Sequence, residues 1–379
     1  MDFNLTEEHE LIRQSVIEFC DRYVCPIADG VDQEPSFPAE TIKKLAEQDL
    51  MGIPYPLEYG GAGSDYLSYV IVLEELSRAC TTTGFTVECH TSLAGFPLFK
   101  FGTEKQKKKY LTPLCKGEML GSFALTDPGA EIDTAAGTTT AALDGNEWVL
   151  NGSKIFISNA TVADVIIVFA MTDTSMGKKG VSAFIVPAGT PGFLIGRNLK
   201  KMGTRGSLTA EVSLQNCRIP EENLLGAEGQ GFDIFMMTLD GARIGIAAQA
   251  VGVAQAALDE SIKYSKQRIQ FGKPIGMFEA IQVMIANMAT EVQASRLLTY
   301  QAAWCYDQGL PYGSQAAMAK LFASETASRQ TDRAVQIHGG IGYVKGSKVE
   351  RLYRDAIITG IYNGTSDMMR MVIAAGLLR

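Results

Sequence analysis

The hydrophobic pattern of the chain changes its period twice, and this change limits the possible fold more than any other feature. Up to about residue 120, apolar residues recur at the three- and four-residue spacing of amphipathic helices. From 121 to 230 short apolar runs alternate with turn residues, and from 231 to 379 the helical spacing returns. Because 379 residues exceed one compact core, we expect an N-terminal helical domain at 1–120, a middle β-domain at 121–230 and a C-terminal helical bundle at 231–379.

Helix boundaries are marked in both helical parts. In the first part, Pro38 suits the first position of a helix over 38–48, and a longer helix is expected at 65–79. In the second part, long apolar stretches predict helices at 241–265, 278–307 and 316–338. Helices of this length are suited to an antiparallel bundle.

The middle part predicts several short strands. Apolar runs at 165–170 and 181–187 are typical of buried strands, and 208–214 alternates in the manner of a half-exposed strand. Asn151-Gly152 lies between two β-like runs, and this pair favours a tight hairpin turn. Several short strands at regular spacing predict a small β-barrel or sandwich.

Composition and charge exclude several classes of function. The net charge of −8 argues against broad nucleic-acid binding, which needs a basic surface. The three histidines and seven scattered cysteines show no metal-ligand spacing, so we expect no metal site, and the thiols suit a reducing, cytoplasmic compartment. The acidic N-terminal residues resemble neither a secretory signal nor a transit peptide, and the absence of a run of about 18 apolar residues argues against a membrane span.

A break between two helical patterns near the C-terminus is the first candidate site. It covers residues 361–367, read Ile-Tyr-Asn-Gly-Thr-Ser-Asp. Gly364 allows a ligand to approach the backbone closely, and Thr365 with Ser366 opens a helix whose free N–H groups favour an anion. The alternative is an ordinary helix–turn–helix corner with a capping threonine.

This stretch and six others, in the same order, resemble the motifs of flavin-dependent acyl-CoA dehydrogenases. The six lie at 125–133, 156–159, 201–207, 223–226, 268–273 and 336–343. The resemblance covers essentially the whole chain and is closest to the butyryl-CoA and short-chain enzymes. It implies a mainly α fold with a middle β-domain: an N-terminal helical domain, a β-barrel-like domain and a C-terminal four-helix bundle, usually assembled as a homotetramer.

The resemblance implies an FAD cofactor and assigns residues to it. Leu125 and Thr126 would bind the pyrimidine edge of the flavin, with Phe156 as a wall against the ring and Ser158 as a hydroxyl donor. The FAD adenine and pyrophosphate would be bound by Arg268, Phe271, Gln336 and Gly340. In this family, that contact is made across a subunit interface. Thr365 and Asp367 complete the cofactor set. Without the resemblance, Phe156 is interpreted as a core aromatic, Ser158 as a strand-end polar residue and Arg268 as a surface residue of a helix end.

The resemblance also assigns residues to the CoA thioester. These are Ile132, Asp240, Arg243 and Gly364, and the alternative for Asp240 and Arg243 is a solvated turn pair. Glu131 and Ile132 replace the Gly-Ser of the family motif. A ligand hydroxyl contact is thereby lost, and a negative charge is added beside a polyanionic ligand.

Asn363 occupies the position at which the family has its catalytic base. In the family, the glutamate at this position removes the α-proton, whereas an amide cannot accept a proton at neutral pH. Some members place the glutamate on the helix just before the arginine that Arg243 matches, and here that residue is Ala242. General-base catalysis contributes roughly 10²–10⁴-fold, so ordinary α,β-dehydrogenation should be nearly silent unless another base is present.

Glu88 is the candidate replacement. It lies in a segment that resembles the far end of the acyl pocket, where an apolar environment would raise its pKa towards that of a useful base. The alternatives are a solvated carboxylate or a polar wall of the pocket. From that depth, Glu88 would meet a γ-carbon, and a γ-proton is acidic when the thioester already has an α,β double bond. Removing this proton, with hydride loss from another β-position of a ring, is a 1,4-elimination that gives a cyclic conjugated diene.

This reaction resembles that of cyclohexenecarboxyl-CoA dehydrogenases of anaerobic bacteria, family members that lack the usual glutamate and degrade alicyclic acids. The thioester oxygen would be polarised by the Asn363 backbone N–H and a flavin hydroxyl, and electrons would pass to an electron-transferring flavoprotein. The alternatives are ordinary α,β-dehydrogenation, enoyl-CoA reduction, a non-oxidative lyase such as a desulfinase, a base-dead CoA-ester-binding protein and an engineered Glu-to-Asn change at Asn363.

Overall fold

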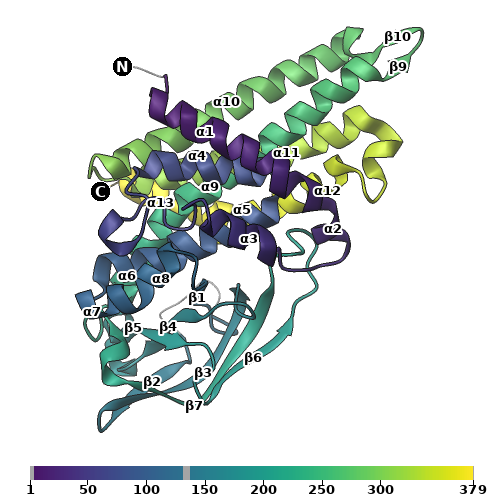
Figure 1. Cartoon of the computed structure of the whole chain (residues 1–379). Helices are drawn as coiled ribbons and strands as arrows, with labels where there is room; N and C mark the ends of the chain where they lie inside the picture. The colour runs from purple at the N-terminus through teal and green to yellow at the C-terminus, as the bar shows by residue number, and fades with distance from the viewer. Residues whose placement is uncertain (1–3, 131–136, 379) are drawn as a thin grey trace.

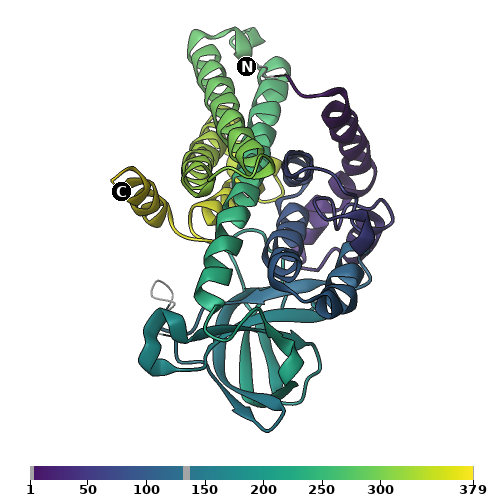
Figure 2. The ribbon, with the colours of Figure 1, turned by 90° about the vertical axis from the view of Figure 1, so that its left-hand side faces the viewer.

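The computed structural model describes residues 4–130 and 137–378, and it has the expected order of helices, strands and helices. The helices lie above a sheet at the lower end of the molecule, and the C-terminal bundle extends away from the sheet (Figures 1 and 2). The three-part architecture is therefore confirmed.

The N-terminal part is helical, and α1 and α4 are its two longest helices. Its α-helices are α1 (Glu7–Phe19), α2 (Ala28–Gln33), α3 (Ala39–Ala46), α4 (Tyr66–Ala79), α5 (Thr81–Glu88), α6 (Phe96–Phe101), α7 (Glu104–Gln106) and α8 (Thr112–Cys115). Asp65 caps α4 by accepting a hydrogen bond from the Ser68 N–H at 2.8 Å. A π-helical segment, Cys89–Gly95, follows α5 directly. Such widened turns are frequent at functional sites.

The middle part is one eight-stranded sheet with the order β6-β7-β3-β2-β4-β5-β8, in which β1 pairs in parallel with β4. Its strands are β1 (Gly121–Ala124), β2 (Thr140–Asp144), β3 (Glu147–Ser158), β4 (Val165–Met171), β5 (Val181–Pro187), β6 (Phe193–Asn198), β7 (Thr209–Pro220) and β8 (Leu224–Leu225). Strand β4 is buried along its whole length, as its continuous apolar run predicts.

The hairpin predicted at Asn151-Gly152 is wrong. Strand β3 continues through both residues, and the turn lies earlier, between Asp144 and Glu147. At Gly152 the register of β3 against β7 shifts, and the backbone has a φ of 147°, where a Cβ would come within 2.5 Å of the Thr139 hydroxyl. Gly152 therefore allows a bulge and a close approach of two backbones. Both require the absence of a Cβ and the positive φ that also favour glycine in turns.

The C-terminal part is a helical bundle organised by α9. Its helices are α9 (Gly231–Gln267), α10 (Glu279–Asp307), α11 (Gly313–His338), α12 (Lys348–Ile357) and α13 (Ser366–Leu377), and a small hairpin, β9 (Ile269–Gln270) with β10 (Lys273–Pro274), follows α9. Helix α9 begins against β5, where a Cβ on Gly231 would lie 2.8 Å from the Cα of Ser182. Its far end carries the hairpin, at the opposite end of the molecule from the sheet (Figure 1).

By length and composition, α9 alone among the described helices could cross a membrane, with a hydropathy of 1.2 over its best window. However, 78% of that window is buried inside the protein. Its apolar surface is thus used for packing against α4, α10 and α11, as in the core helix of a bundle.

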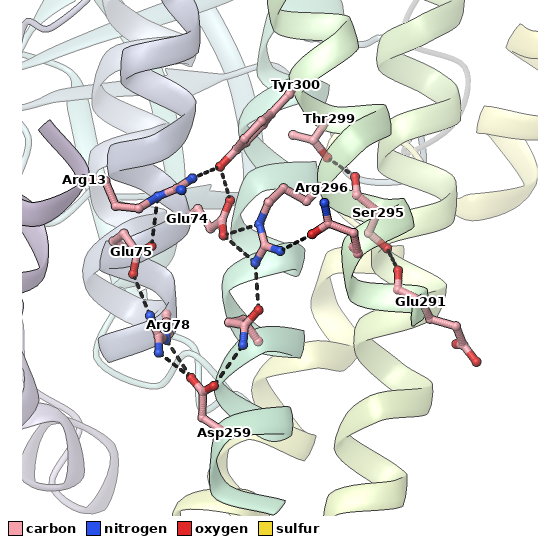
Figure 3. A network of polar contacts seen from close by, with 12 residues as sticks. Arg13, Glu74, Glu75, Arg78, Asp259, Glu291, Ser295, Arg296, Thr299 and Tyr300 are labelled. Atoms are coloured by element: carbon pink, nitrogen blue, oxygen red, sulfur yellow. Dashed lines mark hydrogen bonds and ion pairs between the residues drawn. The ribbon is translucent and has the colours of Figure 1, made fainter. Parts of the chain in front are cut away.

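A buried ionic network joins α1, α4, α9 and α10 (Figure 3). At its centre, Glu74 is 2% exposed and accepts hydrogen bonds from the Arg296 Nε at 2.9 Å and from the Tyr300 hydroxyl at 2.8 Å. Arg296 also donates to Gln255 at 2.8 Å. Because these groups are removed from water, the loss of one partner leaves an uncompensated charge.

We therefore expect Glu74→Gln to lower the free energy of unfolding by about 3 kcal/mol, since a buried pair that loses one charge is strongly destabilised. The thermal and urea midpoints of the purified protein would measure this loss. Arg218→Gln is the matched control, because it breaks an exposed pair with Asp144 on the sheet and should leave both midpoints nearly unchanged. Equal midpoints for Glu74→Gln and the native chain would contradict the importance of the network.

Candidate active site

Glu88 is fully buried at the end of α5, which rules out the solvated alternative. Its Oε1 accepts a hydrogen bond from the Asn363 Nδ2 at 3.4 Å. Its Oε2 is buried and has no hydrogen-bond partner among the residues that the structure describes. Burial raises the pKa of the Glu88 carboxyl to about 8, although hydrogen bonds from Cys89 and Asn363 favour the charged form.

Glu88 lies beside an apolar cluster built from the N-terminal part and α9. The buried members of this cluster are Phe85, Cys89, Leu93, Ala242 and Ile246. Gly245 brings α9 close to the carboxylate, because a Cβ there would lie 3.0 Å from the Glu88 Cγ. The second position at which the family places its base, Ala242, is therefore in the same cluster as Glu88 and carries only a methyl group.

Asn363 reaches Glu88 from the turn before α13. It has a φ of 51°, and Gly364 follows with a φ of 99°, so two successive residues have left-handed backbone conformations. Tyr362 anchors one side of the turn: its hydroxyl donates to Gln249, and its ring lies 4.5 Å from that of Phe85. Two residues 275 positions apart, one an amide and one a carboxylate, thus meet at one point.

The residues predicted to contact the flavin ring lie on two segments that meet: Leu125 and Thr126 directly follow β1, and Phe156 and Ser158 are on β3. The Ile155 N–H donates to the Thr126 carbonyl at 2.9 Å, and the Ser122 hydroxyl donates to the Ser158 carbonyl at 2.6 Å. The buried Lys154 ammonium binds the Leu125 carbonyl at 2.9 Å. Because the carbonyls of Leu125, Thr126 and Ser158 already accept hydrogen bonds within the protein, a ligand here would be bound by backbone N–H groups and side-chain hydroxyls.

Phe156 is not a core aromatic, because 61% of its surface is exposed. Its φ of 59° is an unusual conformation for a bulky residue. An exposed, strained aromatic on an otherwise well-packed strand fits a wall for a flat ligand such as a flavin, and strain of this kind is concentrated at ligand sites. Ser158 lies half-buried at the end of the same strand.

The four residues predicted to hold the adenine and pyrophosphate lie elsewhere. Arg268 and Phe271 follow α9 and are exposed, Phe271 by 93%. Gln336 and Gly340 are exposed at the end of α11, where His338 stacks on Tyr264 of α9. Helix α9 begins against the sheet, and at 1.5 Å per residue its 37 residues extend about 55 Å to this group. The residues predicted for the flavin ring and those predicted for the adenine and pyrophosphate therefore lie apart in one chain.

Thr365 caps α13 by accepting from the Met368 N–H at 3.3 Å, as the capping alternative predicted. Asp367 is exposed in the first turn and pairs with Arg370 at 3.3 Å. Neither contact prevents the N-terminus of α13 from receiving an anion. Ile132, assigned to the substrate by its motif, and Glu131 before it lie outside the described residues.

Asp240 and Arg243 form a buried ion pair within α9, so the solvated-turn alternative is wrong. Arg243 is 3% exposed, and burial lowers its pKa while raising that of Asp240. Gly364 accepts a hydrogen bond from Lys320, a residue that our sequence analysis missed. Its signal was present: Lys320 is a single charged residue among the buried alanines Ala316, Ala317, Ala319 and Ala323 of α11.

Comparisons with known proteins agree with this arrangement. The three domain models of the acyl-CoA dehydrogenases match in order: the N-terminal domain at 6–118, the middle domain at 122–217 and the C-terminal domain at 229–378. The chain belongs to the acyl-CoA dehydrogenase family. It is an FAD-dependent oxidoreductase that acts on CH–CH bonds, and FAD supplies the acceptor for a hydride.

Individual relatives are similar over their whole length. The short-chain specific acyl-CoA dehydrogenase of Clostridium acetobutylicum is 49% identical over all of both chains. The acryloyl-CoA reductase (NADH) of Anaerotignum propionicum is 48% identical over 100% of this chain and 96% of its own. Among solved structures, one described as the electron transferring flavoprotein of Acidaminococcus fermentans contains a chain with a TM-score of 0.99 and 49% identity over all of both chains.

The raised pKa of Glu88 makes stability depend on pH. Between about pH 4.5 and pH 8 the folded state holds a proton that the unfolded state releases, so the free energy of unfolding falls as the pH rises, by at most about 1.4 kcal/mol per unit. Glu88→Gln removes this term. We expect the variant to gain stability relative to the native chain from pH 5 to pH 8, measured as thermal midpoints in excess FAD.

The exposed carboxylate Glu58 provides the control, because Glu58→Gln should follow the native chain at every pH. A constant difference between Glu88→Gln and the native chain across this range would show that Glu88 ionises normally in the folded protein.

Proposed function

We propose that the protein dehydrogenates a cyclic enoyl-CoA, such as a cyclohex-1-ene-1-carboxyl-CoA, with Glu88 as the base. The single observation that carries this proposal is a fully buried carboxylate with one oxygen bound to Asn363 and the other without a partner in the described part of the chain. Both positions that hold the base in relatives lack an acidic group here, so Glu88 is the carboxylate left beside the apolar cluster.

The reaction balances as a 1,4-elimination. Glu88 takes the γ-proton, the electron pair moves through the dienolate, and the other β-carbon of the ring loses a hydride, for which FAD would supply the acceptor. The products are a cyclic conjugated dienoyl-CoA, reduced flavin and one proton on Glu88. A carboxyl with a pKa of about 8 is a stronger base than an ordinary glutamate, which suits a carbon acid of low acidity.

Asn363 has two roles in this proposal. Its side-chain amide holds the Glu88 Oε1 and leaves the Oε2 available for the proton. Its backbone N–H donates to the thioester oxygen, on which negative charge accumulates as the proton leaves. The backbone role needs no carboxylate at position 363, so it is compatible with the change from glutamate to asparagine.

The separation of the predicted FAD-binding residues supports a homo-oligomer, in which a second chain would bring Arg268 and Phe271 to the sheet, and the family resemblance favours a tetramer. The neighbour associated with an electron transferring flavoprotein supports such a protein as the electron acceptor. We further propose a cytoplasmic location without a membrane span, since all seven cysteines are free, six of them are buried, and the apolar α9 is mostly buried.

A second candidate is the oxidation of a short-chain acyl-CoA or the reduction of the corresponding enoyl-CoA. The short-chain dehydrogenase and the acryloyl-CoA reductase at 49% and 48% identity favour it. It requires a proton acceptor or donor at the α-carbon, where this chain has Asn363. The two candidates differ in which ester reduces the flavin.

An anaerobic titration that follows flavin absorbance would distinguish them. We expect cyclohex-1-ene-1-carboxyl-CoA to bleach the flavin, and butyryl-CoA and cyclohexanecarboxyl-CoA to leave it oxidised. Glu88→Gln should slow bleaching by roughly 10²–10⁴-fold, the usual contribution of a general base, without loss of bound FAD. Fast bleaching by butyryl-CoA, or an unaffected Glu88→Gln, would overturn the proposal.

Asn363→Glu is the matched variant for the second candidate. It places a carboxylate at the position that relatives use, and we expect it to gain bleaching by butyryl-CoA. It also places a second carboxylate beside Glu88, and since like charges raise each other's pKa, activity with the cyclic ester should fall.

A further inference from the structure

Lys320 is a fully buried lysine in the middle of α11. Within residues 4–130 and 137–378, no carboxylate lies within ion-pair distance of its ammonium. Burial, together with the positive charge of Arg243, lowers the Lys320 pKa to about 7. A lysine in such surroundings is costly to bury, so the contact that it makes requires an explanation.

That contact is a hydrogen bond from the Lys320 Nζ to the backbone carbonyl of Gly364. Gly364 follows Asn363 directly and has a φ of 99°, where a Cβ would come within 2.7 Å of the Met369 Cε. Residues 361–367 are otherwise half-buried or exposed, so the turn has little core packing of its own. A donor that extends from α11 therefore supplies a fixed point for a strained turn.

Asn363 is consequently anchored on both sides. On one side, the Tyr362 ring packs on Phe85 and its hydroxyl donates to Gln249. On the other side, Lys320 holds the Gly364 carbonyl. The peptide between Tyr362 and Asn363, which carries the Asn363 N–H, cannot rotate freely while both anchors hold.

We propose that Lys320 is a positioning residue for the reaction: through the Gly364 carbonyl it aims the Asn363 N–H at the thioester oxygen. The proposal rests on the role given above to that N–H. It does not depend on Glu88 or on the acyl group, because every acyl-CoA presents the same thioester carbonyl. Asp240 pairs with Arg243 and not with Lys320. The Lys320 ammonium therefore donates to the Gly364 carbonyl.

If Lys320 only stabilised the fold, its replacement would lower the thermal midpoint and leave the recognition of the thioester oxygen unchanged. Replacing a buried charge by an apolar side chain of similar volume is often neutral or stabilising, so Lys320→Met should not lower the thermal midpoint. If Lys320 positions the turn, the same variant should lose recognition of the thioester oxygen. Stability and carbonyl recognition would then change independently.

The test compares the binding of crotonyl-CoA and of its thioether analogue S-but-2-enyl-CoA to the oxidised holoenzyme by calorimetry. The thioether lacks the carbonyl oxygen, so the ratio of the two dissociation constants measures the hydrogen bond to that oxygen alone. We expect Lys320→Met to reduce the preference for the thioester by about tenfold, the equivalent of one hydrogen bond to a carbonyl. Lys320→Gln keeps a shorter N–H donor and should retain part of the preference.

Gln330→Met is the matched control on the same helix. Gln330 is also fully buried, and its amide donates to Glu291 of α10 at 2.8 Å, away from the turn. We expect this variant to lower the thermal midpoint and to leave the thioester preference unchanged.

An unchanged preference in both Lys320 variants, or an equal loss of affinity for thioester and thioether, would overturn the proposal. Because neither ligand requires proton removal, this result can be read even if cyclohex-1-ene-1-carboxyl-CoA fails to bleach the flavin. The failure of the cyclic substrate and the failure of the positioning role are thus separate outcomes.

Discussion

The removal of the Glu88 carboxylate from water is the constraint on which the candidate chemistry depends. Burial raises its pKa to about 8, although hydrogen bonds from Cys89 and Asn363 lower it in part. The cost of burying this group is carried by the packing of α4, α5 and α9 around it. Among the residues that the structure describes, the Oε2 has no hydrogen-bond partner, and a buried carboxylate oxygen of this kind can accept a proton from a substrate.

The length of α9 connects this site to the rest of the architecture. The helix begins against the sheet that carries Phe156 and Ser158, passes Glu88 at Gly245, and ends beside Arg268. A single rigid element thus sets the spacing between the flavin-facing strand, the base and the exposed hairpin. The residues predicted for the adenine and pyrophosphate lie at its far end, away from those predicted for the flavin ring, so we expect FAD binding to depend on the assembly of subunits.

Local signals in the sequence predict most of the helices and strands, but they do not predict contacts between residues far apart in the chain. The apolar period predicts α4 within one residue. For α9 it predicts a start at 241 instead of Gly231, because the first turns of α9 pack on the sheet. The Asn-Gly pair indicated a hairpin and marks a bulge. The meeting of Glu88 with Asn363, and of Lys320 with Gly364, depends on tertiary packing that no local pattern reveals.

The most direct measurement of the central claim is the position at which the enzyme exchanges a proton. Cyclohex-1-ene-1-carboxyl-CoA would be incubated anaerobically with the holoenzyme in D₂O without an electron acceptor, and the recovered ester examined by NMR. The account predicts deuterium at the γ-carbon, with exchange lost in Glu88→Gln and kept in Glu58→Gln. Exchange at the γ-carbon that persists in Glu88→Gln, or no exchange there with the native enzyme, would contradict the assignment of Glu88 as the base.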